Sequence, residues 1–419
     1  MLIKRLLQDK ITESLKHFPA VLLTGSRQVG KSTLASMITK SSWKANYLTF
    51  DDRTTLDAAL YDPDGFILAN KTPLVIDEVQ KVPDIFRCIK LNIDKDRKPG
   101  QFLLTGSTNI MTLKKISETL AGRIAIHELY PFSWAELNKV KNNEIIEKIN
   151  MCSSASELVS ILPKESFMDN ILQIKKIIFK GGYPTPAFID SDEVRNQWFE
   201  SYRKTYIERD IRDIANLEHI PEFNRLLAVI ALRTGQLVNL TNISIEIGLP
   251  LSTLKRYISL LELTYQIYFL YPYYSNIGKR LVKTPKVYYI DTGMVCNITA
   301  TSKWKTLELQ NRVGFIIETW VSNELRKIIS YSKQKPNVYF LRSHSGQEID
   351  FLLEYGENLV GIEVKWLGKI SKQDLKSANF FIENLKDRLN YVIFLYPGNK
   401  SVIFNEKLAA IPFDIFFLG

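Results

Sequence analysis

The sequence contains few of the residues that secreted, zinc-binding or membrane-spanning proteins depend on. Its 419 residues include four histidines and three cysteines, Cys88, Cys152 and Cys296. These cysteines are too few and too widely spaced for a disulfide framework or a zinc cluster, so a cytoplasmic location is expected. No apolar run approaches the length of a bilayer span, so no membrane partner is expected. There is also no internal repeat or low-complexity segment.

The chain is basic and otherwise has an ordinary globular composition. Its formal net charge is +10, and hydrophobic residues make up 45% of it. A chain of this length predicts two or three domains. The positive charge favours an anionic partner, of which nucleic acid is the usual one. A basic but merely solvated surface is the alternative.

Residues 21–34 contain the most informative motif. An apolar run, Val-Leu-Leu-Thr, leads into Gly-Ser-Arg-Gln-Val-Gly-Lys-Ser, and a helical pattern follows. This matches the phosphate-binding loop, whose glycines let backbone amides face one anion. Lys31 is expected to reach the β- and γ-phosphates of ATP, and Ser32 to bind Mg²⁺. The predicted nucleotide-binding residues are Gly25, Ser26, Arg27, Gln28, Val29, Gly30, Lys31, Ser32 and Thr33.

Two further buried-strand patterns end in residues suited to ATP hydrolysis. Residues 72–80 end an apolar run in Asp77 and Glu78, as a parallel strand does when its carboxyl end meets a ligand. Asp77 is predicted to hold Mg²⁺ and Glu78 to polarise the attacking water. Residues 101–109 form another such strand. Its candidate γ-phosphate sensor is Ser107, and the alternatives are Thr105, Asn109 or plain turn chemistry.

Together with Leu120-Ala-Gly-Arg and Tyr130-Pro-Phe-Ser, these motifs resemble one family over nearly the whole chain. It comprises prokaryotic AAA-type (AAA+) P-loop ATPases with a C-terminal domain of unassigned function. The resemblance implies ATP hydrolysis by a homo-oligomer such as a hexameric ring. Arg123 is the candidate for an arginine acting on a neighbouring subunit's site; a structural cation is the alternative.

The middle of the chain predicts a helix-turn-helix followed by two strands. A short helix ends at Gly248, a second begins near Pro250, and strand patterns cover 265–274 and 286–291. This order is typical of a winged helix, which contacts DNA mostly through phosphates. Packing between domains is the alternative role. The candidate DNA contacts are Ser252, Thr253, Lys255, Arg256, Lys279, Arg280 and Lys283, and Lys286 is assigned to the same basic loop.

The C-terminal region contains a second group of candidate catalytic residues. Glu318 lies in a predicted helix, Asp350 opens an apolar strand, and Glu363 and Lys365 share one face of the next strand. A hairpin would bring Asp350 close to Glu363. This Asp…Glu-x-Lys pattern resembles the restriction-endonuclease-like fold, which implies Mg²⁺ at the carboxylates. An ion-paired sheet that only binds is the alternative. Residues 411–419 are predicted to form a closing core strand.

The sequence therefore predicts an α/β protein with four parts. These are an ATPase domain with a parallel sheet, a helical lid or linker, a winged-helix domain and a nuclease-like domain, over residues 1–135, 136–220, 221–300 and 301–419. The expected function is that of an Mg²⁺-dependent ATPase acting on DNA as an oligomeric motor or remodeller. The alternatives are an ATP-gated DNA nuclease and a slow ATPase that controls partner binding.

Overall fold

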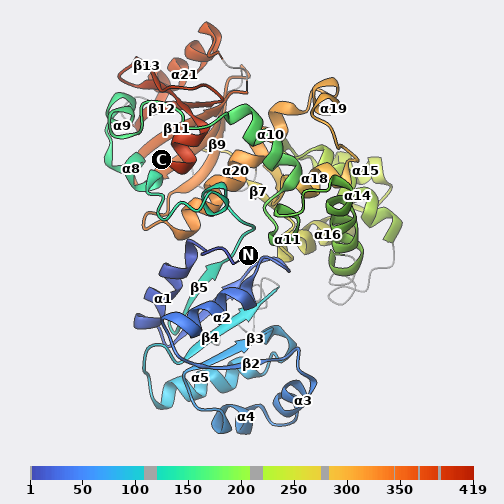
Figure 1. Ribbon diagram of the computed structural model, residues 1–419. Helices are drawn as coiled ribbons and strands as arrows, with labels where there is room; N and C mark the ends of the chain where they lie inside the picture. Colours follow the sequence, from blue (N-terminus) through green and yellow to red (C-terminus); the bar gives the residue numbers. More distant parts are fainter. Residues whose placement is uncertain are drawn as a thin grey trace. The chain divides into compact units, whose positions relative to one another are not determined.

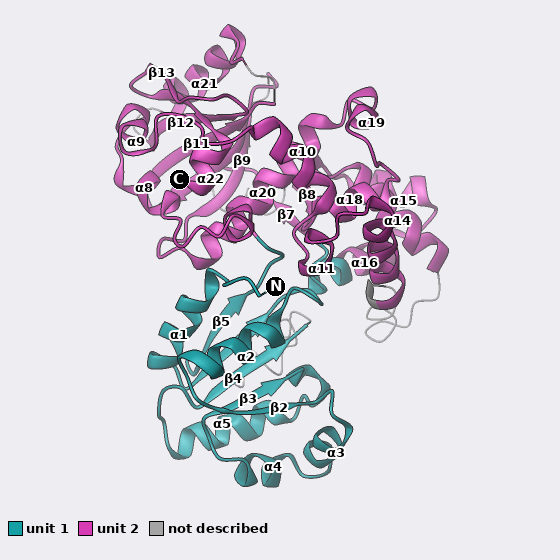
Figure 2. Cartoon of the chain, viewed as in Figure 1, with its two compact units in different colours: residues 1–132, 259–266 teal, residues 133–258, 267–419 magenta. Residues whose placement is uncertain are grey.

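The computed structural model describes residues 2–107, 120–207, 220–274, 283–343, 345–366, 369–385 and 388–419 (Figure 1). The chain divides into two units (Figure 2). Unit 1 contains residues 1–132 and 259–266, and unit 2 contains residues 133–258 and 267–419.

Unit 1 is built on a parallel sheet of five strands in the order β2-β3-β4-β1-β5. The strands are β1 (Ala20–Thr24), β2 (Asn46–Thr49), β3 (Leu74–Asp77), β4 (Phe102–Gly106) and β5 (Ile124–Glu128). Every residue of the three central strands β1, β3 and β4 is buried. This burial explains their continuous apolar runs, because a central strand covered on both faces has no solvent-facing side.

The helices of unit 1 lie between these strands in the chain. They are α1 (Leu7–His17), α2 (Lys31–Ser41), α3 (Arg53–Tyr61), α4 (Pro63–Ala69) and α5 (Ile85–Lys95), with a 3₁₀ turn η1 (Val79–Lys81) after β3. Asp52 and Asp62 cap α3 and α4 by accepting backbone hydrogen bonds. Helix α5 buries Ile85, Ile89 and Ile93 in a core shared with strands β1, β3 and β4. The phosphate-loop strand and the acidic strand are thus held by one core.

Unit 2 contains a mixed sheet of six strands in the order β13-β14-β12-β11-β10-β9. The strands are β9 (Asn337–Arg342), β10 (Glu348–Tyr355), β11 (Asn358–Val364), β12 (Leu389–Tyr396), β13 (Val402–Asn405) and β14 (Leu408–Pro412). Strands β9, β10 and β11 pair antiparallel, whereas β11, β12 and β14 pair parallel. Helices α20 (Val313–Tyr331) and α21 (Lys372–Leu385) belong to the same region. The helix predicted at 312–326 is therefore confirmed, and it is longer than expected.

The middle of unit 2 has three helices and a small sheet. The helices are α14 (Ile220–Leu232), α15 (Leu240–Ile247) and α16 (Leu251–Leu263), the last of which runs on into the second segment of unit 1. Gly248 ends α15 in the left-handed conformation, with φ of 80°, as predicted. Strands β6 (Gln236–Leu237), β7 (Ile267–Leu270) and β8 (Lys286–Tyr289) pair antiparallel in the order β6-β8-β7.

The other helical segments of unit 2 connect these two sheets. They are α7 (Trp134–Leu137), α8 (Ile145–Met151), α9 (Ala155–Ile161), α10 (Asn170–Lys180), α11 (Pro184–Ala187), α12 (Asp192–Tyr202), the π-helical turn η3 (Arg203–Ile207), α18 (Thr292–Ile298), α19 (Trp304–Leu309) and α22 (Phe413–Leu418). Among the helices of the described ranges, none has both the length and the apolar character needed to cross a bilayer.

The predicted strand at residues 411–419 is wrong over most of its length. Strand β14 ends at Pro412, and residues Phe413–Leu418 form helix α22, in which all six side chains are buried. A short, fully apolar run has no periodicity that separates a buried strand from a buried helix. The prediction of a core position is nevertheless confirmed.

Candidate functional site

The phosphate loop of unit 1 joins β1 to α2 through backbone conformations that favour glycine. Gly25 has φ of 144° and Gly30 has φ of 95°. A Cβ atom on Gly25 would lie 2.2 Å from the Leu129 carbonyl oxygen, so no larger residue fits there. Gln28, between them, also has positive φ at 61°. The loop therefore curls as a phosphate site requires, with α2 starting at Lys31.

Lys31 is buried within this loop. Its exposed fraction is 5%, and its ammonium donates hydrogen bonds to the carbonyl oxygens of Gly25 and Ser26 at 2.9 and 2.8 Å. A buried ammonium at the mouth of a helix N-terminus is a strong site for an anion. Of the other predicted loop residues, Ser26 and Val29 are buried, Arg27 and Gly30 are half-buried, and Gln28, Ser32 and Thr33 are exposed.

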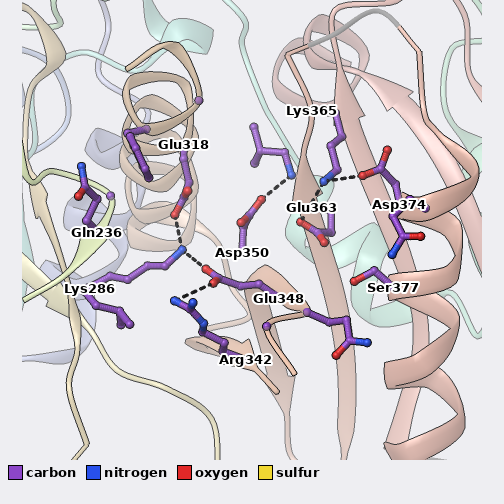
Figure 3. A pocket seen from close by; sticks show the side chains of 18 of the residues that line it. Gln236, Lys286, Glu318, Arg342, Glu348, Asp350, Glu363, Lys365, Asp374 and Ser377 are labelled. Atoms are coloured by element: carbon purple, nitrogen blue, oxygen red, sulfur yellow. Dashed lines mark hydrogen bonds and ion pairs between the residues drawn. The ribbon is translucent and has the colours of Figure 1, made fainter. Parts of the chain in front are cut away.

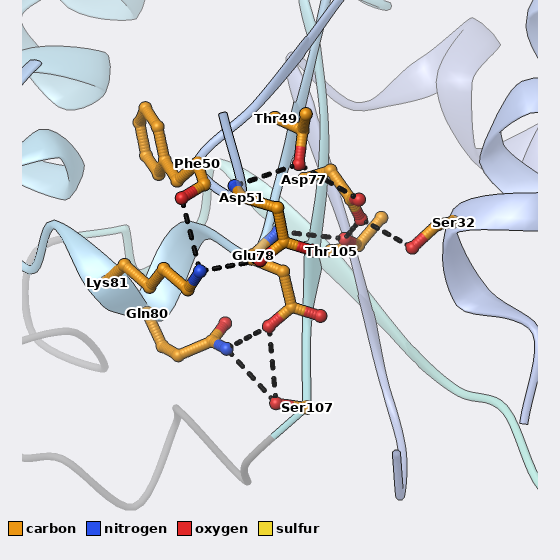
Figure 4. A network of polar contacts seen from close by, with 10 residues as sticks. All are labelled: Ser32, Thr49, Phe50, Asp51, Asp77, Glu78, Gln80, Lys81, Thr105 and Ser107. Carbon is orange, nitrogen blue, oxygen red and sulfur yellow. Dashed lines mark hydrogen bonds and ion pairs between the residues drawn. The ribbon is translucent and has the colours of Figure 1, made fainter. Parts of the chain in front are cut away.

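Asp77 connects the phosphate loop to the acidic strand (Figure 4). Ser32, at the start of α2, donates a hydrogen bond from Oγ to Asp77 Oδ1 at 2.9 Å. Thr105 of β4 donates to the same oxygen, and Thr49 of β2 donates to Oδ2 at 3.4 Å. These three hydroxyl groups orient a carboxylate that is only 4% exposed. Thr105, an alternative sensor in the sequence, therefore orients Asp77.

Glu78 lies on the other side of the β3 terminus with a left-handed backbone, at φ of 58°. Its carboxylate accepts hydrogen bonds from the Gln80 amide and, at 3.4 Å, from the Ser107 hydroxyl. Gln80 also donates to Ser107 Oγ at 3.0 Å. Ser107 is thus adjacent to the predicted general base, as a sensor residue should be. Gln80 was missed, although its place two residues after Glu78 was the available signal.

Two further residues of unit 1 support the phosphate loop. Arg5 is 5% exposed and donates to the Val29 carbonyl oxygen at 2.8 Å and to the Tyr130 carbonyl oxygen at 2.6 Å. Tyr265 donates from its hydroxyl to Thr24 Oγ1, at the end of β1, at 2.7 Å. Neither residue belongs to a recognisable motif, so nothing in the sequence pointed to them.

The structure places Arg123 in an ion pair within its own chain. Its guanidinium contacts the Asp94 carboxylate at 2.7 and 3.1 Å and donates to the Ala121 carbonyl oxygen at 3.0 Å. Acting on a neighbouring subunit would require this pair to open. Asn109, the other alternative sensor, lies outside the described residues.

The chemistry of this first site fits Mg²⁺ and a nucleoside triphosphate. Hydroxyl and carboxylate oxygens are preferred ligands of Mg²⁺, and Ser32 and Asp77 bring one of each within hydrogen-bond distance. The curled loop and Lys31 provide the donors that phosphate oxygens need. Ser32 and Asp77 would therefore hold the metal ion, and Gly25 to Thr33 would hold the phosphates.

The candidate DNA contacts fall into three groups. At the start of α16, Ser252, Lys255 and Arg256 are exposed and Thr253 is half-buried; Lys283 is exposed as well. Lys279 and Arg280 lie outside the described residues. The assignment of Lys286 to the basic loop is wrong, because it opens strand β8 and is 4% exposed.

A second site lies in unit 2, where the β10–β11 hairpin brings two acids together. Phe351 pairs with Ile362, and one step further along this register Asp350 lies opposite Glu363. Asp350 accepts a hydrogen bond from the Val364 amide at 2.8 Å. Burial, the charge of Asp350 and a hydrogen bond to Asp350 raise the pKa of Glu363 well above its ordinary value. The two carboxyl groups therefore share a proton.

Two lysines neutralise the remaining acids of this site (Figure 3). Lys286 contacts Glu318 Oε1 at 2.8 Å and also pairs with Glu348. Lys365 lies 2.9 Å from Asp374 Oδ1 but 3.9 Å from Glu363 Oε2. Glu348 was set aside in the sequence and Asp374 was missed. Both depend on neighbours distant in the chain.

These side chains line a cavity of about 900 Å³. Its charged lining residues are Lys286, Glu318, Arg342, Glu348, Asp350, Glu363, Lys365 and Asp374. Across the described ranges, no group of three or more His, Cys, Asp or Glu side chains is arranged to hold a metal ion. Each carboxyl group of the predicted nuclease-like set has instead a proton or a lysine as its partner. The arrangement does not fit the Mg²⁺ that the motif implies.

Comparisons with known proteins agree with the geometry of unit 1. Residues 17–138 match the sequence model of an AAA domain family. Residues 171–305 and 313–416 match two domains of unknown function, DUF8612 and DUF4143.

Similar whole proteins occur in bacteria and archaea. An uncharacterized protein of Mycobacterium tuberculosis is 27% identical over 408 residues, which cover 97% of this chain and 82% of that protein. An uncharacterized protein of Methanocaldococcus jannaschii is 23% identical over 404 residues, covering 92% of this chain and 84% of the relative.

Among solved structures, a Walker-type ATPase of Pyrococcus abyssi matches with a TM-score of 0.42 at 15% identity, covering 70% of this chain and 94% of its own. A signal transduction ATPase with numerous domains from Pyrococcus horikoshii matches with a TM-score of 0.24 at 14% identity, covering 79% of this chain and 47% of its own. Both scores are too low to support an argument. The match over residues 17–138, together with the phosphate loop and the acidic strand beside it, identifies this part of the chain as a P-loop ATPase domain of the AAA type.

Proposed function

We propose that the protein is an Mg²⁺-dependent ATPase. The observation that carries this proposal is the hydrogen bond between Ser32 and Asp77 beside the buried ammonium of Lys31. It joins the phosphate loop to the acidic strand across the strand order β3-β4-β1. ATP hydrolysis needs these two elements together, because one holds the phosphates and the other holds the metal ion and the water.

Each residue of the site has a distinct role in the proposed reaction. The loop amides and Lys31 bind the phosphates and stabilise the charge that develops on them. Bound Mg²⁺ would add positive charge next to the β- and γ-phosphates. Glu78 accepts a proton from the attacking water, and Ser107 and Gln80 orient its carboxylate.

A substitution at Lys31 tests the proposal directly. We expect Lys31→Ala to reduce phosphate release from ATP by about 100-fold or more, because loop donors act on the transferring group. Lys40→Ala is the matched control, since Lys40 lies exposed on the same helix. Wild-type turnover in Lys31→Ala, or turnover that is unaffected by removal of Mg²⁺, would contradict the proposal.

We also propose DNA as the partner of unit 2. The proposal rests on the turn between α15 and α16, where Ser252, Lys255 and Arg256 are exposed at the start of the second helix, and on the net charge of +10. In a helix-turn-helix, this end of the second helix meets the duplex. The three-stranded sheet that contains β7 and β8 would then serve as the wing.

Salt dependence tests the DNA proposal. Each phosphate contact contributes about 0.9 to the slope of log K against log salt. The double variant Lys255→Gln, Arg256→Gln should therefore lower the slope by about two. An unchanged slope would exclude these contacts. ATPase rates with duplex, single-stranded and branched DNA would show which form stimulates turnover, and indifference to all three would favour a protein-binding switch.

Oligomerisation is part of the same proposal, since AAA-type sites are often completed by a second subunit. Arg123 is the candidate residue, and its pair with Asp94 is the contact that assembly would have to replace. We expect ATPase activity per chain to rise with protein concentration in the wild type and to stay constant in Arg123→Ala. A concentration-independent wild-type rate would contradict this role.

A further inference from the structure

Lys286 is a buried cation at the centre of the unit 2 cavity. Its side chain is 5% exposed, and its ammonium lies 2.8 Å from Glu318 Oε1, contacts Glu348, and lies 5.4 Å from the centre of the Phe340 ring. It comes from β8, whereas Glu318 comes from α20 and Glu348 from β10. One ammonium thus joins three elements that are distant in the sequence (Figure 3).

The acids that face this ammonium keep it charged. Burial alone would lower the pKa of Lys286, but the carboxylates of Glu318, Asp350 and Glu348 outweigh burial and raise it above its ordinary value. Glu318 has a second donor, because the Tyr288 hydroxyl donates to its Oε1 at 2.6 Å. The oxygen that would face a metal ion is therefore already occupied by two donors.

The other predicted metal ligands are also engaged. Asp350 accepts from the Val364 amide at 2.8 Å and shares a proton with Glu363. Lys365, the expected catalytic lysine, pairs with Asp374. A divalent cation needs deprotonated oxygen ligands that converge on one point. Here the positive charge comes from the protein itself.

We propose that Lys286 is the resident cation of this cavity and excludes divalent metal ions from it. The cavity is then a charge-compensated binding site rather than a metal-dependent nuclease centre. The reason is energetic: a divalent ion would have to displace a buried ammonium and leave that ammonium without its carboxylate partners, which is costly. Removing the ammonium reverses the balance, because uncompensated buried carboxylates then attract a cation.

Mn²⁺ binding to the full-length chain without nucleotide tests this proposal, with free Mn²⁺ measured by electron paramagnetic resonance. At about 1 mM Mn²⁺, a weak-site concentration, the wild type and Asp350→Asn should bind equal amounts. Lys286→Met should bind one additional ion about tenfold or more tightly, a gain of about 1.4 kcal/mol per tenfold. The additional ion should be lost in the double variant Lys286→Met, Asp350→Asn.

Controls separate the proposal from misfolding and from the ATP site. Arg342→Met also removes a cavity cation, but Arg342 lies 3.7 Å from Glu348 with its side chain 47% exposed, so no additional ion is expected. Far-ultraviolet circular dichroism and thermal unfolding report whether Lys286→Met folds. If it does not, the wild-type comparison still decides: an ion that wild type binds and Asp350→Asn loses overturns the proposal. Neither arm depends on ATP hydrolysis.

Discussion

The Ser32 hydroxyl donates to the Asp77 carboxylate at 2.9 Å, although the two residues are 45 positions apart in the chain. Ser32 lies at the start of α2 and Asp77 at the end of β3. Strand β4 separates β3 from β1 in the sheet, so the contact spans two strand spacings. The carboxyl ends of parallel strands meet at one edge, which explains how both residues reach one metal position.

Replacing Glu78 should separate binding from hydrolysis. We expect Glu78→Gln to retain ATP binding and to lower kcat by about 10²- to 10⁴-fold, because glutamine cannot accept the proton of the attacking water. Binding of a fluorescent ATP analogue and steady-state phosphate release measure the two effects. Glu13→Gln, on the exposed face of α1, is the control. Unchanged kcat would remove Glu78 from the mechanism.

Gln80 should act through Glu78. Its amide donates to both Glu78 and Ser107, so Gln80→Leu releases the carboxylate from its orientation. We expect kcat to fall about tenfold at nearly constant KM, which corresponds to the loss of one hydrogen bond to a charged group. Gln80→Glu should lower kcat further, because its carboxylate repels that of Glu78. Faster turnover in Gln80→Leu would mean that Gln80 restrains Glu78 instead.

The unit 2 cavity should make stability depend on pH. Burial, opposed by Lys286, raises the pKa of Glu318 from 4.5 to about 7. Between these values the folded chain holds a proton that the unfolded chain has released, so the free energy of unfolding falls as pH rises. Glu318→Gln should weaken this fall, measured by denaturant unfolding at both ends of the window. An identical pH profile would contradict the raised pKa. Glu363 titrates in both proteins and cancels in the comparison.

Gly181 should be intolerant of a side chain. Its φ is +67°, and a Cβ atom would lie 2.3 Å from Asp291 Oδ1. Asp291 is 2% exposed and accepts from the amides of Gly182 at 2.6 Å and Met294 at 3.0 Å. We expect Gly181→Ala to lower the free energy of unfolding by about 2–4 kcal/mol.

Gly356→Ala is the matched control for this prediction. Gly356 has φ of +62°, and nothing lies within 4 Å of its added Cβ, so only backbone strain of about 1 kcal/mol is expected. Equal losses in the two variants would show that the clash with Asp291 is not the cause. Denaturant unfolding monitored by tryptophan fluorescence measures both.

Local sequence was sufficient for most of unit 1. The glycine spacing in residues 25–32 and the apolar run ending in Asp77 and Glu78 each depend on a few consecutive residues, and the structure brings them together as expected. The hairpin that brings Asp350 opposite Glu363 was also predictable, because strand register follows from alternation and a short turn. The run after Pro412 was not, since uniform hydrophobicity does not distinguish a helix from a strand.

The sequence by itself determined where the triphosphate site lies and which acids belong to it, because that chemistry needs fixed residue types at fixed spacing. Only the tertiary structure decided what the C-terminal acids face. Lys286 reads as one more basic residue near a loop, yet strand pairing carries it into the cavity beside Glu318 and Glu348. Charge compensation in a buried cavity depends on distances across elements, and no local pattern in the chain encodes those distances.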